Sequence, residues 1–302
     1  MNDAQSTIIA SPTADHVVSG AAPVATTHCY LNGKIMPVDE AQVSIKDIGL
    51  LRGFGIYEAL ATTNRKPFMF ADHMARYRRT ANELHLKIPA SEEEILAAIN
   101  DLVERNVPEG QEATVKFFVT GGTAIHGIEY DYETPTFYML VDPLVPFAPQ
   151  YYTDGASVTV FEHLRQFPQL KTTNYIQAVM LQQARKDAGA IEILYTWGGK
   201  VLECATSNFM IVKDGKIITA KDNILFGITR KVALDVARPH FPIEEREVSV
   251  EELHAADEAF LTSSFKDVMP VVKVGDKMIG DGKVGPVTKR VMELFHEFTR
   301  TY

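Results

Sequence analysis

The sequence has few of the features that mark secreted, membrane or nucleic-acid-binding proteins. Only two of its 302 residues are cysteine, Cys29 and Cys204, so a disulfide framework is implausible and a reducing, cytoplasmic compartment is expected. No apolar run approaches the roughly 18–20 residues needed to span a bilayer. The formal net charge of -9 argues against a polyanion-binding role. We therefore predict no membrane partner, no nucleic-acid partner and no metal site.

The composition is otherwise that of a globular protein. The chain is 46% hydrophobic and 23% charged, and its length is enough for two domains. Residues 1–27 are rich in Ala, Ser and Thr, contain no Lys or Arg, and lack the basic and apolar regions of a signal peptide. We interpret them as a flexible extension, because they have little to bury.

Hairpins and helices are predicted to alternate in residues 28–141, which we interpret as a small α/β domain. Asn32-Gly33 indicates a hairpin turn between two short strands. A strand over 55–62 is followed by a turn at 64–67 and a partner strand at 68–70. Ser91 with Glu94 is typical of a capping box that begins a helix. The other elements predicted here are a helix from residue 71 and strands at 114–120 and 136–141.

A proline-rich segment separates this domain from the rest of the chain. Residues 142–150 contain Pro143, Pro146 and Pro149, and proline is disfavoured inside helices and central strands. We predict that they link the first domain to a larger second domain, residues 151–302. Its predicted helices are 175–188, 229–237 and 284–299, and its predicted strands are 193–197, 209–213, 217–220 and 259–262.

Three elements of the second half stand out for their order and spacing. Lys171 begins the run Lys-Thr-Thr-Asn-Tyr, Glu203 ends an apolar strand before Cys-Ala-Thr-Ser-Asn, and Gly227-Ile228-Thr229 begins a predicted helix. Taken alone, Lys171 is typical of a solvated surface lysine. Together the elements resemble the fold-type IV pyridoxal-phosphate enzymes, which include D-amino-acid transaminases, branched-chain aminotransferases and aminodeoxychorismate lyases. The resemblance covers residues 29–302.

The resemblance implies a fold and a cofactor site. The fold would be a small N-terminal α/β domain and a larger C-terminal pseudo-barrel domain. Lys171 would hold pyridoxal 5'-phosphate covalently, and Glu203 would keep the pyridine nitrogen protonated. A helix N-terminus offers free N–H groups to a phosphate. The family's phosphate contacts correspond to Arg76, Ile228, Thr229 and Ser264.

Local spacing distinguishes among the members of the family. Branched-chain enzymes usually read Lys-x-Gly-Gly-Asn-Tyr, whereas this chain has the Lys-x-x-Asn spacing of the D-amino-acid transaminases and the lyases. The branched-chain enzymes also have a Tyr-x-Arg where this chain has Thr114 and Lys116. The run 49–58 resembles the D-amino-acid transaminase segment that ends in Val-Tyr-Glu, and it places Tyr57 at the active-site tyrosine.

The substrate-carboxylate site departs from that pattern. D-amino-acid transaminases usually grip the carboxylate with an Arg-x-His pair, where this chain has His126 and Ile128. Arg52 is the best replacement, because a guanidinium can hold a carboxylate through two parallel hydrogen bonds. The alternative is a surface arginine paired with an acid such as Asp47. His126 and Lys266 are weaker candidates.

The sequence thus predicts a homodimeric aminotransferase with its active site between domains and near the subunit interface. Its substrates would be a D-amino acid, such as D-alanine or D-glutamate, and a 2-oxo acid. Three alternatives remain open: a branched-chain L-amino-acid aminotransferase, an aminodeoxychorismate lyase, and a non-enzymatic protein on the same fold.

Overall fold

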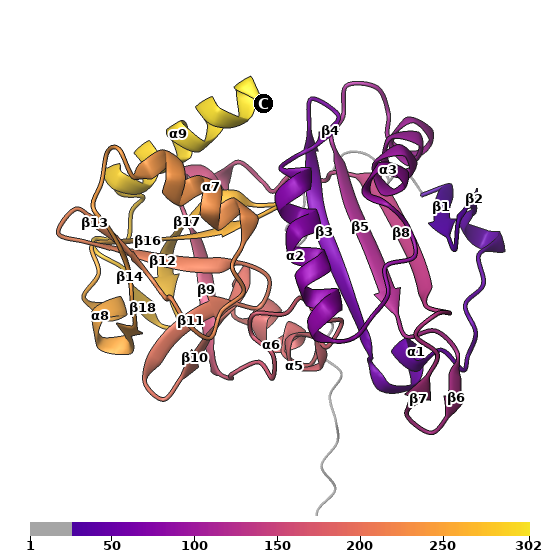
Figure 1. Ribbon diagram of the computed structural model, residues 1–302. Helices are drawn as coiled ribbons and strands as arrows, with labels where there is room; N and C mark the ends of the chain where they lie inside the picture. Colours follow the sequence, from indigo (N-terminus) through magenta and orange to yellow (C-terminus); the bar gives the residue numbers. More distant parts are fainter. Residues whose placement is uncertain (1–25) are drawn as a thin grey trace, which may run out of the picture.

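The computed structural model describes residues 26–302 (Figure 1). Most of its strands belong to two large sheets that lie side by side, and a two-stranded hairpin of β6 (Ala124–His126) and β7 (Glu129–Tyr130) projects beyond the first sheet. The predicted mixed α/β architecture is confirmed. The flexible extension predicted for residues 1–27 falls outside the described residues, except for Thr26 and Thr27.

The first sheet is six-stranded and antiparallel, and two amphipathic helices, α2 (Phe70–Glu83) and α3 (Glu92–Asn106), contribute to its core. The strand order is β2 (Lys34–Pro37), β1 (His28–Leu31), β8 (Thr136–Pro143), β5 (Ala113–Thr120), β3 (Gly55–Thr63) and β4 (Lys66–Pro67). Along most of β5 and β8 every second side chain is buried in this core, as the period of a strand requires.

Turn chemistry explains the two hairpins of this sheet. Asn32 and Gly33 have φ of 47° and 91°, so the predicted Asn-Gly turn between β1 and β2 is confirmed. The partner strand predicted at 68–70 is wrong, because β4 comprises residues 66–67. Asn64 and Arg65 both adopt positive φ and close a two-residue turn, which pairs β4 with the end of β3. The predicted capping box of Ser91 and Glu94 is present at the start of α3.

The second sheet is 10-stranded, mixed and curled. Parallel pairing of β9 with both β10 and β17 joins its two halves. Its order is β14 (Ile243–Glu245), β13 (Lys216–Thr219), β12 (Asn208–Lys213), β16 (Glu258–Ser263), β17 (Asp267–Val274), β9 (Ala156–Glu162), β10 (Glu192–Trp197), β11 (Lys200–Cys204) and β15 (Val248–Ser249), with β18 (Lys277–Met278) on β17.

Two of the three helices predicted in the second half begin and end close to their predicted positions. α7 (Ile228–Ala237) and α9 (Pro286–Thr301) pack together against β16 and β17 (Figure 1). α9 starts two residues later than predicted because Gly285 and Pro286 occupy its N-cap and first position. The shorter helices are α1 (Ile48–Arg52), α4 (Gln150–Thr153), α8 (Val250–His254) and the 3-10 helix η1 (Val38–Glu40).

The helix predicted over 175–188 is divided into α5 (Ile176–Met180) and α6 (Gln182–Asp187). The break falls at Leu181, and the Gln182 side chain donates a hydrogen bond of 2.9 Å to the Ala178 carbonyl. A side chain thus satisfies a carbonyl at the end of α5, as helix termini require.

We propose that each large sheet and its helices form one domain, with boundaries at 28–141 and 151–302. β8 continues through Asp142 and Pro143, which pair with β5, so the first two residues of the predicted linker are strand.

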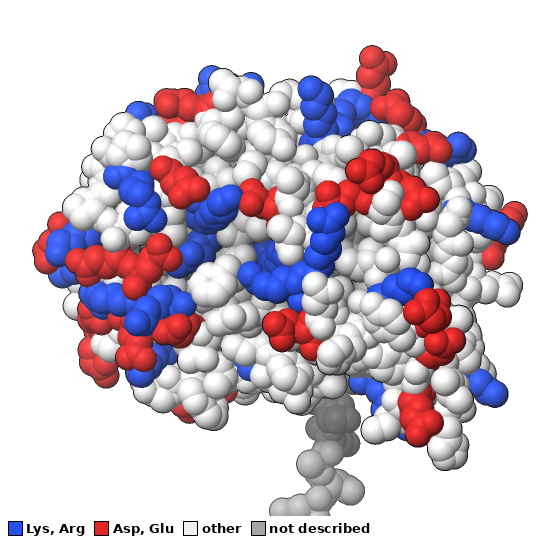
Figure 2. All heavy atoms as spheres, viewed as in Figure 1, with Lys and Arg blue, Asp and Glu red and all other residues white. Residues whose placement is uncertain are grey.

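On the face in Figure 2, acidic and basic side chains are interspersed. None of the helices within residues 26–302 is both long enough and apolar enough to cross a bilayer.

Candidate active site

Lys171 lies where the second half of the chain crosses the edge of the first sheet. Its carbonyl accepts a hydrogen bond of 3.0 Å from the Tyr57 N–H, and the Thr173 N–H donates to the Gly55 carbonyl at 3.0 Å. Residues 171–173 therefore pair with the beginning of β3. This backbone pairing fixes the Lys171 side chain between the two sheets.

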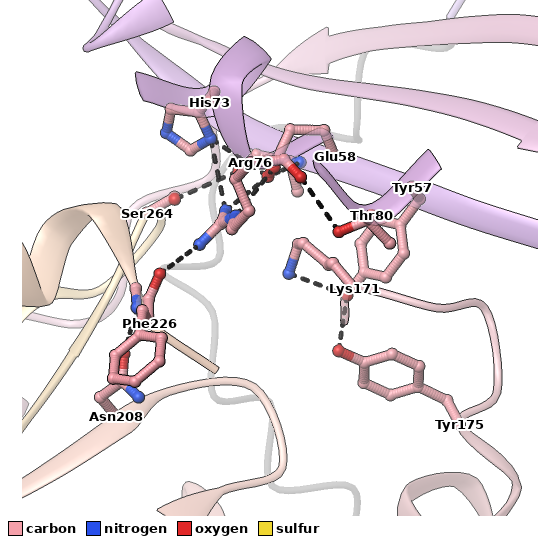
Figure 3. Close-up of polar contacts among 12 residues, drawn as sticks. Tyr57, Glu58, His73, Arg76, Thr80, Lys171, Tyr175, Asn208, Phe226 and Ser264 are labelled. Carbon is pink, nitrogen blue, oxygen red and sulfur yellow. Dashed lines mark hydrogen bonds and ion pairs between the residues drawn. The ribbon is translucent and has the colours of Figure 1, made fainter. Parts of the chain in front are cut away.

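The Lys171 amine is prepared for nucleophilic chemistry. The pKa of Lys171 is lowered to about 8, first by burial and then by the positive charges of Arg76 and Arg165, against the opposing effect of Glu58. Nζ lies 3.3 Å from the Tyr57 hydroxyl, which donates to the Tyr175 hydroxyl at 2.7 Å (Figure 3). The structure thus brings Tyr57 to Lys171, with Tyr175 behind it.

Glu203 is held by four donors near the end of β11. Its Oε1 accepts from the Arg165 guanidinium at 3.0 Å and 2.5 Å, and its Oε2 accepts from the Leu225 N–H at 3.0 Å and the Asn208 amide at 3.3 Å. Burial raises the pKa of Glu203, and Arg165 opposes that shift. The carboxyl group is fixed in orientation and can pair with a protonated ring nitrogen.

The beginning of α7 is the part of the site suited to a phosphate. The Asn208 side chain accepts from the Gly227 N–H at 3.1 Å, and a Cβ at Gly227 would lie 2.1 Å from that oxygen. A larger residue at position 227 would displace the Asn208 side chain. The N-terminus of α7 has no side-chain cap, and the buried hydroxyls of Thr262 and Ser263 have no hydrogen-bond partner among residues 26–302. Unpaired donors of this kind suit an anion.

Arg76 adds a guanidinium to this end of the pocket. The fully buried Glu58 binds it through two hydrogen bonds, of 2.6 Å and 3.0 Å, and Arg76 also donates to the Phe226 carbonyl at 3.1 Å (Figure 3). Burial alone would raise the pKa of Glu58, but Arg76 and His73 hold that pKa far below its usual value. Arg76 therefore bridges α2 and β3 to the start of α7.

One pocket unites all six of the predicted cofactor residues. Of the three cations that line it within the described chain, Arg76 and Arg165 have carboxylate partners and Lys171 has none. The pocket combines a low-pKa amine, a buried carboxyl group and unpaired hydroxyl donors, so its residues fit pyridoxal 5'-phosphate. Its predicted lining residues are Arg76, Lys171, Glu203, Ile228, Thr229 and Ser264.

A larger cavity of about 700 Å³ adjoins this pocket, because Arg165, Tyr175 and Ala205 line both. Arg52, at the end of α1, lines the cavity and is exposed. It has no acidic partner within residues 26–302: its one hydrogen bond, of 2.8 Å, goes to the Leu51 carbonyl. Asp47, the alternative partner, instead caps α1 and accepts from two threonines.

The two weaker substrate candidates lie elsewhere. His126 is exposed on β6 and is not among the residues that line either cavity, whereas Ile128 lines the larger one. Lys266 is buried, and its amine lies 3.0 Å from a carboxylate oxygen of Glu192. Lys266 is thus already paired and does not reach the cavity.

Several residues of the site are not in the predicted set. Arg165 binds Glu203, and Glu58 binds Arg76. Tyr175 forms a hydrogen bond with Tyr57. The sequence carries a signal for Tyr175, which belongs to the Lys171 motif, and for Glu58, which follows Tyr57. Arg165 lies in an irregular segment without a motif, and no local pattern indicates its partner.

Comparison with known proteins identifies the family. The family model for class IV amino-transferases matches residues 55–274. The D-alanine aminotransferase of Staphylococcus haemolyticus is 32% identical over 283 residues, which cover 90% of this chain and 98% of that enzyme. That of Listeria monocytogenes serotype 1/2a (strain 10403S) is 31% identical over 279 residues, covering 89% and 96%. The chain belongs to the class IV aminotransferases.

Solved structures confirm the fold. The branched-chain aminotransferase of Escherichia coli superposes with a TM-score of 0.83 at 22% identity, over 91% of this chain and 95% of that one. The branched-chain aminotransferase of Thermoproteus uzoniensis, solved with norvaline, gives 0.81 at 24% identity over the same shares. Another branched-chain aminotransferase, solved with pyridoxamine 5'-phosphate, gives 0.82 at 24% identity, again over 91% and 95%. At these identities the likeness concerns the fold alone.

Family membership confirms the general reaction and the cofactor. Class IV aminotransferases use pyridoxal 5'-phosphate and transfer an amino group between an amino acid and a 2-oxo acid. The enzyme is therefore an aminotransferase.

The low pKa of Lys171 predicts how cofactor loading depends on pH. Only the neutral amine attacks an aldehyde, and its fraction rises about tenfold per pH unit below the pKa. When the apoprotein is mixed with pyridoxal 5'-phosphate, the cofactor bound to Lys171 should give a visible absorption band. We expect the rate at which this band forms to increase with pH and to level off above about pH 8. Stopped-flow absorbance measures this rate.

Lys171→Ala is the control and should form no such band. A rate that continues to rise to about pH 10.4, the value of an unperturbed lysine, would contradict the assigned environment.

Proposed function

We propose that the enzyme transfers the amino group between a D-amino acid, such as D-alanine or D-glutamate, and a 2-oxo acid. The observation that carries this proposal is the unpaired guanidinium of Arg52 in the cavity beside Lys171. The Lys-x-x-Asn spacing and the similarity to D-alanine aminotransferases support the D configuration.

The proposed roles of the residues follow from their positions. When bound, pyridoxal 5'-phosphate supplies a ring that withdraws electrons from the substrate Cα. Lys171 would hold the cofactor, would be released when the substrate amine replaces it, and would then move the proton between the substrate Cα and the cofactor carbon as general base and acid. Glu203 would hold the proton on the ring nitrogen, in the orientation that Arg165 and the Leu225 N–H give to its carboxyl group.

The remaining predicted residues bind and orient. We assign the phosphate to Arg76, Ile228, Thr229 and Ser264, of which Ser264 also donates to the Ala59 carbonyl at 3.2 Å. Tyr57 orients the Lys171 amine through its hydroxyl. Arg52 takes the substrate carboxylate, because it lines the larger cavity, whereas His126 lines neither cavity.

The branched-chain L-amino-acid alternative is tested by substrate competition. With D-alanine, D-glutamate, L-alanine and L-leucine added separately to the holoenzyme, we expect the D-amino acids to discharge the visible band faster. Rapid-scanning absorbance under single-turnover conditions measures each rate without a second substrate. Faster reaction of L-leucine than of both D-amino acids would assign the pocket to branched-chain substrates.

Arg52→Ala tests the carboxylate site. Loss of a charged hydrogen bond costs about 1.5–3 kcal/mol, so kcat/KM for D-alanine and D-glutamate should fall at least about tenfold. Cofactor affinity should stay unchanged, because Arg52 lies outside the cofactor pocket.

Arg290→Ala is the matched control: it removes a partly exposed arginine on α9, far along the chain from the site. If Arg52→Ala keeps the parent's kinetics with both D-amino acids, another group binds the carboxylate.

We further propose that the enzyme is a homodimer. Large apolar side chains are exposed near the cavity on α1 and α5: Leu50 is 70% exposed, and Ile176, Val179 and Met180 are 69%, 69% and 70% exposed. Apolar groups of this size in one region are typical of a subunit interface.

Sedimentation equilibrium should give twice the 33.6 kDa chain mass. Replacing Ile176 and Met180 with Asp should shift the mass toward the monomer, and a parent mass of one chain would contradict the proposal.

A further inference from the structure

A second buried ion pair lies directly behind the cofactor pocket. Lys266, on the turn before β17, and Glu192, at the start of β10, are 8% and 3% exposed, and their charged atoms are 3.0 Å apart. Neither side chain lines the cofactor pocket or the larger cavity. Buried ion pairs contribute little net stability relative to apolar residues of similar volume, so stability alone gives a weak reason for this pair.

The pair is connected to the pocket through two hydroxyl groups. Thr206 and Ser207 both donate to Oε1 of Glu192, Ser207 at 2.9 Å. The Lys266 amine donates in turn to the Thr206 oxygen at 3.0 Å and the Ser207 oxygen at 3.4 Å. All three protons of Lys266 therefore have acceptors, and both hydroxyls are fixed in orientation.

Thr206 and Ser207 belong to the turn that joins the two ends of the cofactor pocket. This turn runs from Glu203, which we assign to the ring nitrogen, to Asn208, which binds both Glu203 and the Gly227 N–H. Two backbone hydrogen bonds hold it: the Cys204 N–H donates to the Ser207 carbonyl, and the Ala205 N–H donates to the Ile193 carbonyl. Within the described chain, the hydroxyls of Thr206 and Ser207 form hydrogen bonds only with the ion pair behind them.

We propose that Lys266 and Glu192 are positioning residues for the cofactor, which hold the 203–208 turn so that Glu203 and Asn208 keep their places at the two ends of the pocket. The proposal concerns the cofactor pocket and does not depend on which amino acid is the substrate.

Orientation of the hydroxyl protons also separates two groups of hydroxyls in the pocket. Thr206 and Ser207 donate their protons to Glu192, so they offer only acceptor lone pairs to a bound group. Thr262 and Ser263 have no partner in the described chain and retain free protons. The ion pair therefore withholds the Thr206 and Ser207 protons from a bound anion, whereas Thr262 and Ser263 can still donate theirs.

The double variant Glu192→Leu/Lys266→Met tests the proposal, because it replaces the pair with apolar side chains of similar size. A pair that serves only stability can be replaced in this way at little cost, whereas each single variant leaves a buried charge unpaired. We expect the double variant to fold with a Tm close to that of the parent. We expect its Kd for pyridoxal 5'-phosphate to rise at least about tenfold and the visible band of the bound cofactor to shift.

Two further variants complete the design. Thr206→Val/Ser207→Ala leaves the ion pair in place, removes both linking hydroxyls, and should raise Kd and shift the band in the same direction. Lys213→Met/Asp257→Leu removes an ion pair between partly exposed side chains, 2.9 Å apart, and neither residue lines the pocket, so it should change neither Kd nor the band. The proposal is overturned if either test variant folds and keeps the parent's Kd and band.

Discussion

The backbone pairing of residues 171–173 with the beginning of β3 is the constraint on which the site depends. It is short, with one hydrogen bond of 3.0 Å on each side, yet it joins the second half of the chain to the first sheet beside the site. Through it the strand that carries Tyr57 and Glu58 is fixed relative to Lys171. A lysine on a free loop would have neither its desolvation nor its tyrosine neighbour, and its pKa would stay near the usual value.

Charge pairing around the pocket leaves one amine available. Arg76 is neutralised by Glu58, Arg165 by Glu203 and Lys266 by Glu192, each at hydrogen-bonding distance in a buried or nearly buried setting. Lys171 has no carboxylate partner in the described chain and lies in the field of two guanidinium groups. The arrangement selects Lys171 for Schiff-base chemistry, because an unpaired lysine close to other cations gives up its proton most readily.

The 203–208 turn links this electrostatic arrangement to the geometry of the pocket. Asn208 contacts Glu203 at one end and Gly227 at the other, so a displacement of the turn would move the ring and phosphate contacts together. Gly227 has no room for a Cβ, which shows how closely the start of α7 approaches Asn208. Buried polar networks of this kind are effective only when every member has its partner.

The sequence by itself determined the elements whose signals are local. The Asn32-Gly33 turn, the Ser91 capping box and the separate motifs at Lys171, Glu203 and Gly227 are each encoded within a few residues, because backbone preferences and covalent chemistry act at short range. Only the tertiary structure decided which distant groups meet. Arg165 is 38 residues from Glu203, and Tyr57 is 118 from Tyr175. Such pairs follow no sequence period, since only the packing of separate elements brings them together. The same packing leaves Arg52 without an acidic partner in the described chain and places Lys266 in an ion pair with Glu192.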